Sequence, residues 1–345
     1  MTSIPRRRAT DIEPVPFPAL IADIGGTNVR LAILEDPHST LREFATIGTG
    51  SFPDFAAAAT STVLDTTSIM PSSLLIAIAG PLHPGPMKLT NADWVIDPRQ
   101  IIEALNLKTL ITFNDFEALS LSLPALREDQ IHKIGGGEGE SRQPRLVVGP
   151  GTGLGVAALL YMDQHYIPVP GEGGHMSFGP ESDRDYAIWP RLERFHGRIT
   201  GEALLSGNGL ARIYRAVCAV EGVDGSACRD GAAVSAKADE GDALATEAID
   251  LFLTYLGRYV GDLSLVFLPR GGVYVAGGIA PRLKDRFAKS GFREAFESKA
   301  PHTRIMSQTP TYLVTEPRPA VAGLATFATM PERFAIDLSG RRFDA

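Results

Sequence analysis

Two segments that combine glycine with threonine could bind phosphate groups. The first is Gly25-Gly26-Thr27-Asn28, and the second runs from Gly149 to Gly155 and contains Gly151, Thr152 and Gly153. Glycine lets backbone N–H groups line a concave turn and approach a phosphate closely, and a threonine hydroxyl adds a donor. Two such turns could therefore hold the β- and γ-phosphates of one nucleotide.

Neither segment fits the two commonest phosphate-binding motifs. A P-loop needs a lysine after its last glycine, and neither segment contains one. A dinucleotide-binding loop opens a helix, whereas the residues that follow here, Val29–Leu34 and Val156–Met162, are typical of strands. Each segment taken alone could be a tight hairpin turn. Their occurrence together, with an acid beside the first, favours phosphate binding.

Asp23 ends the predicted strand that precedes the first turn. A carboxylate at this point could hold Mg²⁺ against the phosphates, directly or through water. The alternative is an acid that only solvates the turn. The metal is favoured because the turns carry little positive charge and phosphoryl transfer needs the phosphates to be neutralised.

Asn114 and Asp115 join a predicted strand, Leu110–Phe113, to a predicted helix, Phe116–Leu123. The positive end of the helix dipole favours an ionised Asp115. The residue types alone favour a helix N-cap, because Asn and Asp are preferred there. A carboxylate that accepts a proton is the alternative.

The elements around these residues alternate between strands and helices. The further strands that we predict are Leu20–Ile24, Leu74–Ala79, Leu146–Val148, Tyr166–Val169 and Val273–Ala276. The further helices begin at Pro98, with Asp97 as N-cap, and near Pro281, or cover Leu204–Ala219, Ala243–Val260 and Pro319–Thr329. This alternation predicts an α/β protein, and the two strand–turn–strand segments indicate a duplicated plan.

The composition indicates a globular protein that binds neither nucleic acid nor membranes. Apolar residues make up 44% of the 345 residues, and no run reaches the ~18 apolar residues of a membrane helix. The formal net charge of −7 argues against a phosphate-backbone or anionic-lipid partner. Residues 1–18 lack the apolar stretch of a secretory signal and are expected to be a loose leader of a cytoplasmic protein. In that compartment Cys218 and Cys228 are expected to be reduced thiols.

Short motifs along nearly the whole chain resemble the bacterial glucokinase family, which has the hexokinase/actin/Hsp70-like ATPase fold. The resemblance is specific because eight motifs share the family's order and spacing. They are residues 20–34 (LIADIGGTNVRLAIL), 76–81 (IAIAGP), 90–94 (TNADW), 114–118 (NDFEA), 147–156 (VVGPGTGLGV), 169–175 (VPGEGGH), 202–210 (EALLSGNGL) and 273–281 (VYVAGGIAP).

The resemblance implies two α/β lobes around a ligand cleft. A small lobe would comprise residues 19–113 and 317–345, and a large lobe residues 114–316. It also implies an ATP- and Mg²⁺-dependent kinase that phosphorylates glucose at O6 for glycolysis, usually as a homodimer. The cysteine-rich zinc motif of the related ROK-type kinases does not follow His175, so no zinc is expected.

The resemblance further assigns roles to individual residues. The glycine turns would bind the phosphates, Gly277-Gly278 would lie by the adenosine, and Asp115 would be the catalytic base. The sugar would be bound by Asn114, Asp115, Glu172, His175 and Glu202. Carboxylates can accept two adjacent hydroxyls of a pyranose and a histidine can donate to one, although surface acids and a core histidine are the plainer interpretation of the last three.

Other functions remain open from the sequence. The same residues would serve a kinase for another hexose, such as fructose or mannose. A sugar-binding regulator would need a DNA-binding element, and no basic helix-turn-helix segment is evident. An actin-like filament or a chaperone-type ATPase would not need the group formed by Glu172, His175 and Glu202.

Overall fold

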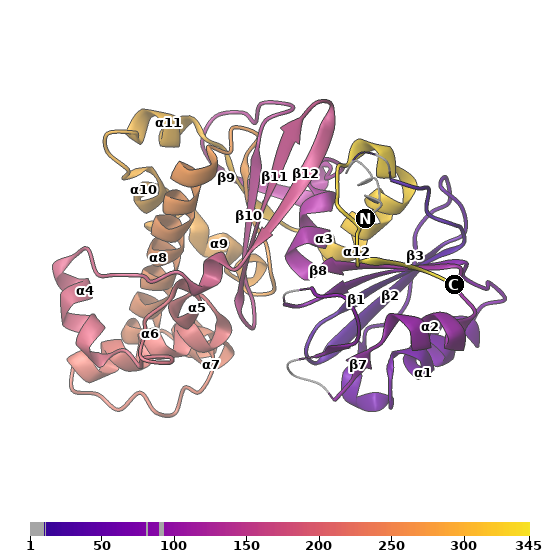
Figure 1. Cartoon of the computed structure of the whole chain (residues 1–345). Helices are drawn as coiled ribbons and strands as arrows, with labels where there is room; N and C mark the ends of the chain where they lie inside the picture. Colours follow the sequence, from indigo (N-terminus) through magenta and orange to yellow (C-terminus); the bar gives the residue numbers. More distant parts are fainter. Residues whose placement is uncertain (1–9, 11, 81, 90–92) are drawn as a thin grey trace, which may run out of the picture. The chain divides into compact units, whose positions relative to one another are not determined.

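The computed structural model describes residue 10 and residues 12–80, 82–89 and 93–345 (Figure 1). Most of the expected leader, Pro81 of the IAIAGP motif and residues 90–92 of the TNADW motif therefore lie outside the described residues. None of the helices in the described part of the chain is both long and apolar enough to span a membrane.

The chain divides into two compact units of mixed α/β structure. The first is made of residues up to Leu126, Leu159–Pro170 and Glu316–Ala345, and the second of Arg127–Ala158 and Gly171–Thr315. The expected lobes would have divided after residue 113, but α3 (Asp115–Ser122) groups with the first unit because it packs against α12 (Pro319–Thr329) of that unit.

A seven-stranded sheet forms the centre of the first unit. Its main order is β15-β8-β5-β1-β2-β3, and β4 also pairs with β2. The strands are β1 (Ala19–Ile24), β2 (Asn28–Leu34), β3 (Arg42–Glu43), β4 (Ile47–Gly48), β5 (Ser73–Ile78), β8 (Thr109–Asn114) and β15 (Arg342–Asp344). β1 and β2 form the predicted antiparallel hairpin, whereas β1, β5 and β8 are parallel. A separate pair joins β6 (Met87–Lys88) to β7 (Val95–Ile96).

Helices cover both faces of this sheet (Figure 1). On one face, Phe55 of α1 (Phe55–Ala59) and Ile101 of α2 (Pro98–Leu105) join a core with alternate residues of β1, β2 and β5. As predicted, Asp97 caps α2 by accepting from the backbone N–H groups of Arg99 and Gln100. On the other face α3 and α12 pack together and against the strands, with the rings of Phe113 and Phe327 5.0 Å apart.

The described end of the expected leader is held in place. Val15 is buried, the Pro16 carbonyl accepts a 2.6 Å hydrogen bond from Ser73 Oγ, and the Pro18 carbonyl accepts one from the Ser72 N–H. This segment is therefore not loose, as we had expected. The sequence does not reveal that its carbonyl groups accept hydrogen bonds from the N-terminal end of β5.

The second unit is built on a six-stranded sheet in the order β12-β11-β10-β13-β14-β9. The strands are β9 (Ile131–Gly135), β10 (Arg145–Pro150), β11 (Leu154–Met162), β12 (His165–Gly171), β13 (Val273–Val275) and β14 (Thr311–Val314). Since only three residues join the neighbouring strands β10 and β11, they form the second predicted hairpin. Residues from Leu159 to the end of β11, and β12 up to Pro170, group with the first unit.

The helices of the second unit include one long helix, α8, against which several of the others pack. They are α4 (Asp183–Ile188), α5 (Gly201–Leu204), α6 (Gly207–Val220), α7 (Gly231–Asp239), α8 (Ala243–Phe267), α9 (Lys284–Phe287), α10 (Phe292–Glu297) and α11 (Thr303–Gln308). Side chains of α6, α7, α8 and α10 form one continuous core with β10 and β13.

The helix predicted over Leu204–Ala219 is present as α6, but it begins at Gly207 instead of Leu204. α5 ends at Leu204, and Ser206 starts α6 as its N-cap by accepting from the Gly209 N–H. Ser206 was a visible signal for this break, because serine before a glycine-rich turn is a preferred N-cap.

Candidate active site

The first glycine turn is braced by its own backbone and by a neighbouring threonine. The Gly25 N–H donates to the Asn28 carbonyl over 2.9 Å, which closes the turn between β1 and β2. The Thr49 N–H donates to the Thr27 carbonyl over 3.0 Å, and Thr49 Oγ1 donates to the Gly26 carbonyl over 3.4 Å. Thr49 was not identified from the sequence, because it is distant from the turn along the chain.

Asp23 lies beside this turn and pairs with Arg30. The two residues are cross-strand partners in the β1–β2 ladder, and Arg30 Nη1 lies 2.8 Å from Asp23 Oδ2. Burial raises the pKa of the Asp23 carboxyl above its usual value, while the charge and hydrogen bond of Arg30 act in the opposite direction.

Asp23 also fits the expected Mg²⁺. The donor type suits this ion, which commonly binds one or two carboxylates, waters and substrate phosphates. Arg30 Nη1 already donates to Asp23 Oδ2, so this carboxylate is better suited to hold the ion through a bridging water than to coordinate it directly with both oxygens.

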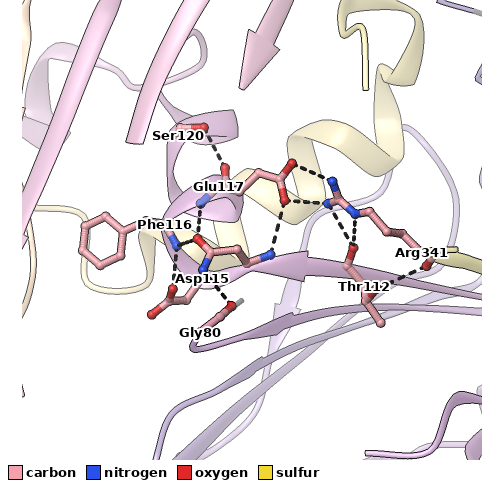
Figure 2. Close-up of polar contacts among 8 residues, drawn as sticks. Gly80, Thr112, Asp115, Phe116, Glu117, Ser120 and Arg341 are labelled. Atoms are coloured by element: carbon pink, nitrogen blue, oxygen red, sulfur yellow. Dashed lines mark hydrogen bonds and ion pairs between the residues drawn. The ribbon is translucent and has the colours of Figure 1, made fainter. Parts of the chain in front are cut away.

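The carboxyl ends of three parallel strands meet near Asp115. Ile24 of β1, Ile78 of β5 and Asn114 of β8 lie in register across the sheet. Ligands of open α/β sheets bind at this edge. The Asn114 side chain connects two of these strand ends, since its Nδ2 donates to the Gly80 carbonyl over 3.1 Å (Figure 2).

Asn114 is the N-cap of α3. Its Oδ1 accepts from the N–H groups of Phe116 and Glu117 at 3.0 and 3.1 Å, and Glu117 Oε2 accepts from the Asn114 N–H at 3.2 Å (Figure 2). This reciprocal capping box satisfies three backbone donors at the junction of β8 and α3.

Asp115 occupies the first position of α3 and is partly exposed. Its Oδ1 accepts from the Phe116 N–H over 2.9 Å, but Asn114 is the residue that caps the helix. The interpretation as a helix N-cap therefore applies to Asn114 and not to Asp115. A partly exposed carboxylate at a helix N-terminus is favoured in its ionised form and can accept a proton from a substrate.

The second glycine turn lies at the start of β11 in the second unit. The Gly151 N–H donates to the Gly153 carbonyl, and the Gly151 carbonyl accepts from the Gly207 N–H at the start of α6. Thr152 is exposed at the tip of this turn. Because both backbone groups of Gly151 are bonded within the unit, the exposed Thr152 is the residue of this turn that we expect to offer a donor to a phosphate.

Gly277 and Gly278 lie next to this turn. Gly277 has a positive φ of 83°, and a Cβ there would come within 2.5 Å of the Pro150 carbonyl oxygen. The Ile279 N–H donates to the same carbonyl over 3.3 Å. The structure thus brings together two of the segments expected to bind the nucleotide.

Glu202 lies against the second glycine turn. It belongs to the first turn of α5, and its Oε2 accepts from the Leu154 N–H over 3.0 Å. A Cβ at Gly153 would come within 2.5 Å of the same oxygen. Glu202, which was expected to bind the sugar, therefore contacts the second glycine turn directly.

The segment Glu172–His175 packs onto the other side of Leu154. Gly174 is buried, and a Cβ there would overlap the Leu154 carbonyl oxygen. Glu172 Oε2 and His175 Nε2 are 3.6 Å apart and both side chains are more than half exposed. Leu154 is thus the point at which Glu172–His175, Glu202 and the glycine turn meet.

Two residues that the sequence did not identify fix this segment. Tyr259 of α8 donates its hydroxyl proton to the Gly173 carbonyl. Arg198 Nη2 donates to the His175 carbonyl over 3.1 Å and to Ser177 Oγ over 2.9 Å. Their positions distant in the chain gave no local signal.

Each unit therefore carries part of the expected site. The first holds a glycine turn, the acid that was expected to hold Mg²⁺ and a partly exposed carboxylate at a helix start. The second holds the other turn, the Gly277-Gly278 segment and a group of two carboxylates and an imidazole. These are the groups that transfer of a phosphoryl group to a polyhydroxyl substrate requires.

Known proteins resemble this chain over most of its length. A family model described as Glucokinase matches residues 20–331. The chain is 46% identical to the glucokinase of Sinorhizobium medicae over 95% of its own length and 97% of that protein, and 44% identical to that of Rhizobium etli over 96% and 97%.

Solved structures agree with this relationship. A glucokinase from an Antarctic psychrotroph is 30% identical, with a TM-score of 0.80 over 90% of this chain and 98% of that one. A glucokinase of Balamuthia mandrillaris, solved with glucose, shares the fold at a TM-score of 0.73 and 21% identity, covering 90% and 93% of the two chains. The resemblance deduced from the motifs is confirmed, and the chain belongs to the glucokinase family.

Proposed function

We propose that this protein transfers the γ-phosphoryl group of ATP to O6 of D-glucose. The observation that carries the proposal is the partly exposed Asp115 carboxylate at the start of α3. The N-cap of this helix is Asn114, so Asp115 is not needed for that role. Family membership supports it, since the matched relatives are named as glucokinases.

In this reaction the O6 oxygen forms a bond to the γ-phosphorus and the bond to the β,γ-bridging oxygen breaks. The electron pair of that bond leaves with ADP, and Asp115 takes the proton of the hydroxyl. Because phosphoryl transfer has a loose transition state, Asp115 acts mainly by orienting the oxygen and accepts the proton late.

The remaining expected residues complete the substrate sites. Gly25–Asn28 and Gly151–Gly153 bind the phosphates, and Gly277-Gly278 lies by the adenosine. Asn114, Glu172, His175 and Glu202 pair with the sugar hydroxyls, which excludes analogues that would leave those groups unsatisfied. Asp23 would hold Mg²⁺, which would supply neutralisation of the phosphate charge. The full assignment includes a cytoplasmic homodimer that supplies glycolysis with glucose 6-phosphate.

A matrix of phosphoryl donors and sugars tests the reaction. Purified protein is assayed for ADP or its analogue with ATP, other nucleoside triphosphates and polyphosphate, each against glucose, fructose, mannose and a no-sugar control. The expected result is the highest kcat/KM for ATP with glucose. A higher value for another hexose would replace the substrate, and sugar binding without turnover would indicate a regulator instead.

The role of Asp115 is tested by Asp115→Asn. Loss of a general base lowers kcat by about 10²–10⁴-fold, while sugar affinity, measured by calorimetry, is largely kept. Asp183→Asn is a matched control, because Asp183 is also the first residue of a helix with a capping box, in α4. Near-normal turnover by Asp115→Asn would exclude this carboxylate as the base.

A further inference from the structure

Arg341 connects the C-terminal segment to the junction of β8 and α3. Its Nη1 and Nη2 donate to Glu117 Oε1 and Oε2 over 3.0 and 2.5 Å, and its Nε and Nη2 donate to the Thr112 carbonyl over 3.2 and 3.1 Å (Figure 2). One guanidinium thus ties the end of a strand to the first turn of the following helix. Asn114 and Asp115 are the middle two of the four residues between these anchor points.

The pairing is strong because Glu117 is buried. Its side chain is only 2% exposed, against 19% for Arg341. A buried carboxylate without a cation carries a desolvation penalty of about several kcal/mol, so its orientation depends on the partner. The bidentate fork of Arg341 fixes both oxygens of Glu117, and Oε2 in turn accepts from the Asn114 N–H.

The position of Arg341 is itself fixed by the sheet. β15 pairs with β8, and the Arg341 carbonyl accepts from the Thr112 N–H over 2.9 Å and from Thr112 Oγ1 over 3.3 Å. Thr109 Oγ1 donates to Asp344 Oδ1 over 2.8 Å, and the guanidinium carbon of Arg341 lies 5.2 Å from the centre of the Phe113 ring. Arg341 therefore contacts the strand through its backbone, its guanidinium and the neighbouring ring.

We infer that Arg341 is a positioning residue for the catalytic base, acting through Glu117 and Asn114 from a segment beyond the residues that the family model matches. The inference rests on the proposed role of Asp115. The order of contacts is Arg341 to Glu117, Glu117 to the Asn114 backbone, and Asn114 to the Gly80 carbonyl and the α3 N-terminus. A small displacement of a reacting group can lower the rate by about 10²-fold, which makes such a support consequential.

The test uses Arg341→Lys in the full chain. Lysine keeps a positive charge beside Glu117, but its single ammonium cannot reproduce the fork to Glu117 and the two bonds to the Thr112 carbonyl. We expect kcat for glucose to fall about ten-fold or more at a temperature where circular dichroism shows a fully folded protein, with KM for ATP within two-fold of wild type. Glu117→Gln, which keeps an acceptor for Asn114 but weakens the fork, should show a smaller fall in kcat.

Arg293→Lys is the matched control for a merely structural arginine. Arg293 donates to Glu297 and to the carbonyls of Met306, Ser307 and Thr309, none of which is a proposed site residue. We expect it to lower the midpoint of urea unfolding without changing kcat. A kcat for Arg341→Lys that stays within two-fold of wild type would overturn the inference.

The experiments distinguish failure of the positioning role of Arg341 from failure of the proposed role of Asp115 as the base. If Asp115→Asn is inactive and Arg341→Lys is fully active, only the positioning role is wrong. If Asp115→Asn turns over normally, the proposed base is wrong, and the positioning inference falls with it whatever the effect of Arg341→Lys.

Discussion

At the scale of one residue, the proposed role of Asp23 requires a charged form that its burial disfavours. Burial disfavours its ionised form, and Arg30 offsets this only in part, so the net effect is a raised pKa. The charged form is nevertheless the one that can hold Mg²⁺. A carboxyl whose pKa is raised by burial beside a charged partner is expected at functional sites more than at structural ones.

Asp23→Asn should raise the free energy of unfolding at neutral pH and lower activity. A raised carboxyl pKa means that the folded protein binds protons more tightly than the unfolded chain, so stability is lost as pH rises from the unfolded value of 3.8 through the folded pKa. The amide does not titrate, and Arg30 can stay solvated because its side chain is 36% exposed, against 12% for Asp23.

Urea unfolding between about pH 4 and pH 8 checks this expectation. The advantage of Asp23→Asn over wild type should grow with pH and then level off, while kcat at saturating Mg²⁺ falls. A variant that is less stable than wild type at neutral pH would show that the ion pair with Arg30, and not burial, dominates at this position.

Glu202 and Gly153 form a second test at this scale. Alanine at Gly153 would place its Cβ 2.5 Å from Glu202 Oε2 and displace that carboxylate from the Leu154 N–H. Because Glu202 is proposed to bind the sugar, Gly153→Ala should lower kcat/KM for glucose by about ten-fold, a value typical of one lost charged hydrogen bond.

Gly179→Ala is the control for that substitution, since a Cβ at Gly179 meets no atom within 4 Å. Steady-state kinetics with glucose varied at saturating ATP give the comparison. Equal kcat/KM values for the two variants would mean that Glu202 does not depend on the space left by Gly153.

Local signals singled out Asp23 beside a glycine turn and Asn114 and Asp115 at a helix start, where a cap was the favoured interpretation. The resemblance to the glucokinase family assigned site roles to Asn114, Asp115 and Glu202, but neither the signals nor the resemblance revealed the residues that support them. Thr49, Tyr259, Arg198 and Arg341 act on the site from elements far along the chain. An arginine near the end of a chain has no pattern that distinguishes it from a solvated surface charge.

At the scale of elements, the close packing of α12 on α3 supports the helix that begins with the proposed base, Asp115. Gly323 faces α3, and a Cβ there would overlap the Ala118 carbonyl oxygen and lie 3.0 Å from the Ser122 nitrogen. Only glycine allows the two backbones to approach so closely. This explains the small residues that made Pro319–Thr329 recognisable as a helix in the sequence.

Gly323→Ala should therefore be strongly destabilising. Backbone atoms of α3 cannot rotate away as a side chain could, so the overpacking should lower the free energy of unfolding by about 3 kcal/mol, the upper part of the usual range. Chemical denaturation measures the change, with Gly50→Ala as control because a Cβ at Gly50 has open space. If Gly323→Ala lost less free energy of unfolding than Gly50→Ala, α3 and α12 would be able to move apart with little loss of stability.

The sequence predicted the main elements better than their ends. Both hairpins and the span of α12 were predicted, because apolar runs, glycine turns and Pro319 mark them clearly. The break before α6 was missed although Ser206 signals it, and β15 was missed because a strand of three residues owes its existence to its distant partner β8. Short elements made by tertiary pairing have little pattern of their own.

At the scale of the whole molecule, the chain passes between the two units four times. The first unit begins with β1 and β2 and is completed only by Glu316–Ala345, which supplies α12 and β15. The second unit contains β9, β10, β13 and β14 together with α4 to α11 before that point. The two units therefore depend on different parts of the sequence.

A chain that ends after Thr315 should lose the fold of the first unit and keep that of the second. The truncation removes Val321, Leu324, Phe327 and Phe334, all fully buried, and each contributes about 1.5–3 kcal/mol. Their sum, about 6–12 kcal/mol, is comparable to the whole stability of a typical domain of about 5–15 kcal/mol. We therefore expect the first unit to be unfolded after this loss of stabilising free energy.

The two tryptophans make this measurable, because each reports on one unit. Trp94 is buried in the first, and Trp189 packs against the core of the second. In single-tryptophan variants of the truncated chain, Trp94 should emit like a solvated indole without urea, while Trp189 keeps a cooperative transition. A chain ending after Arg341 is the control, since it retains α12 and the cation that pairs with the buried Glu117, and its Trp94 should stay folded. A cooperative Trp94 transition at the wild-type urea concentration in the shorter chain would mean that the first unit folds without its C-terminal helix.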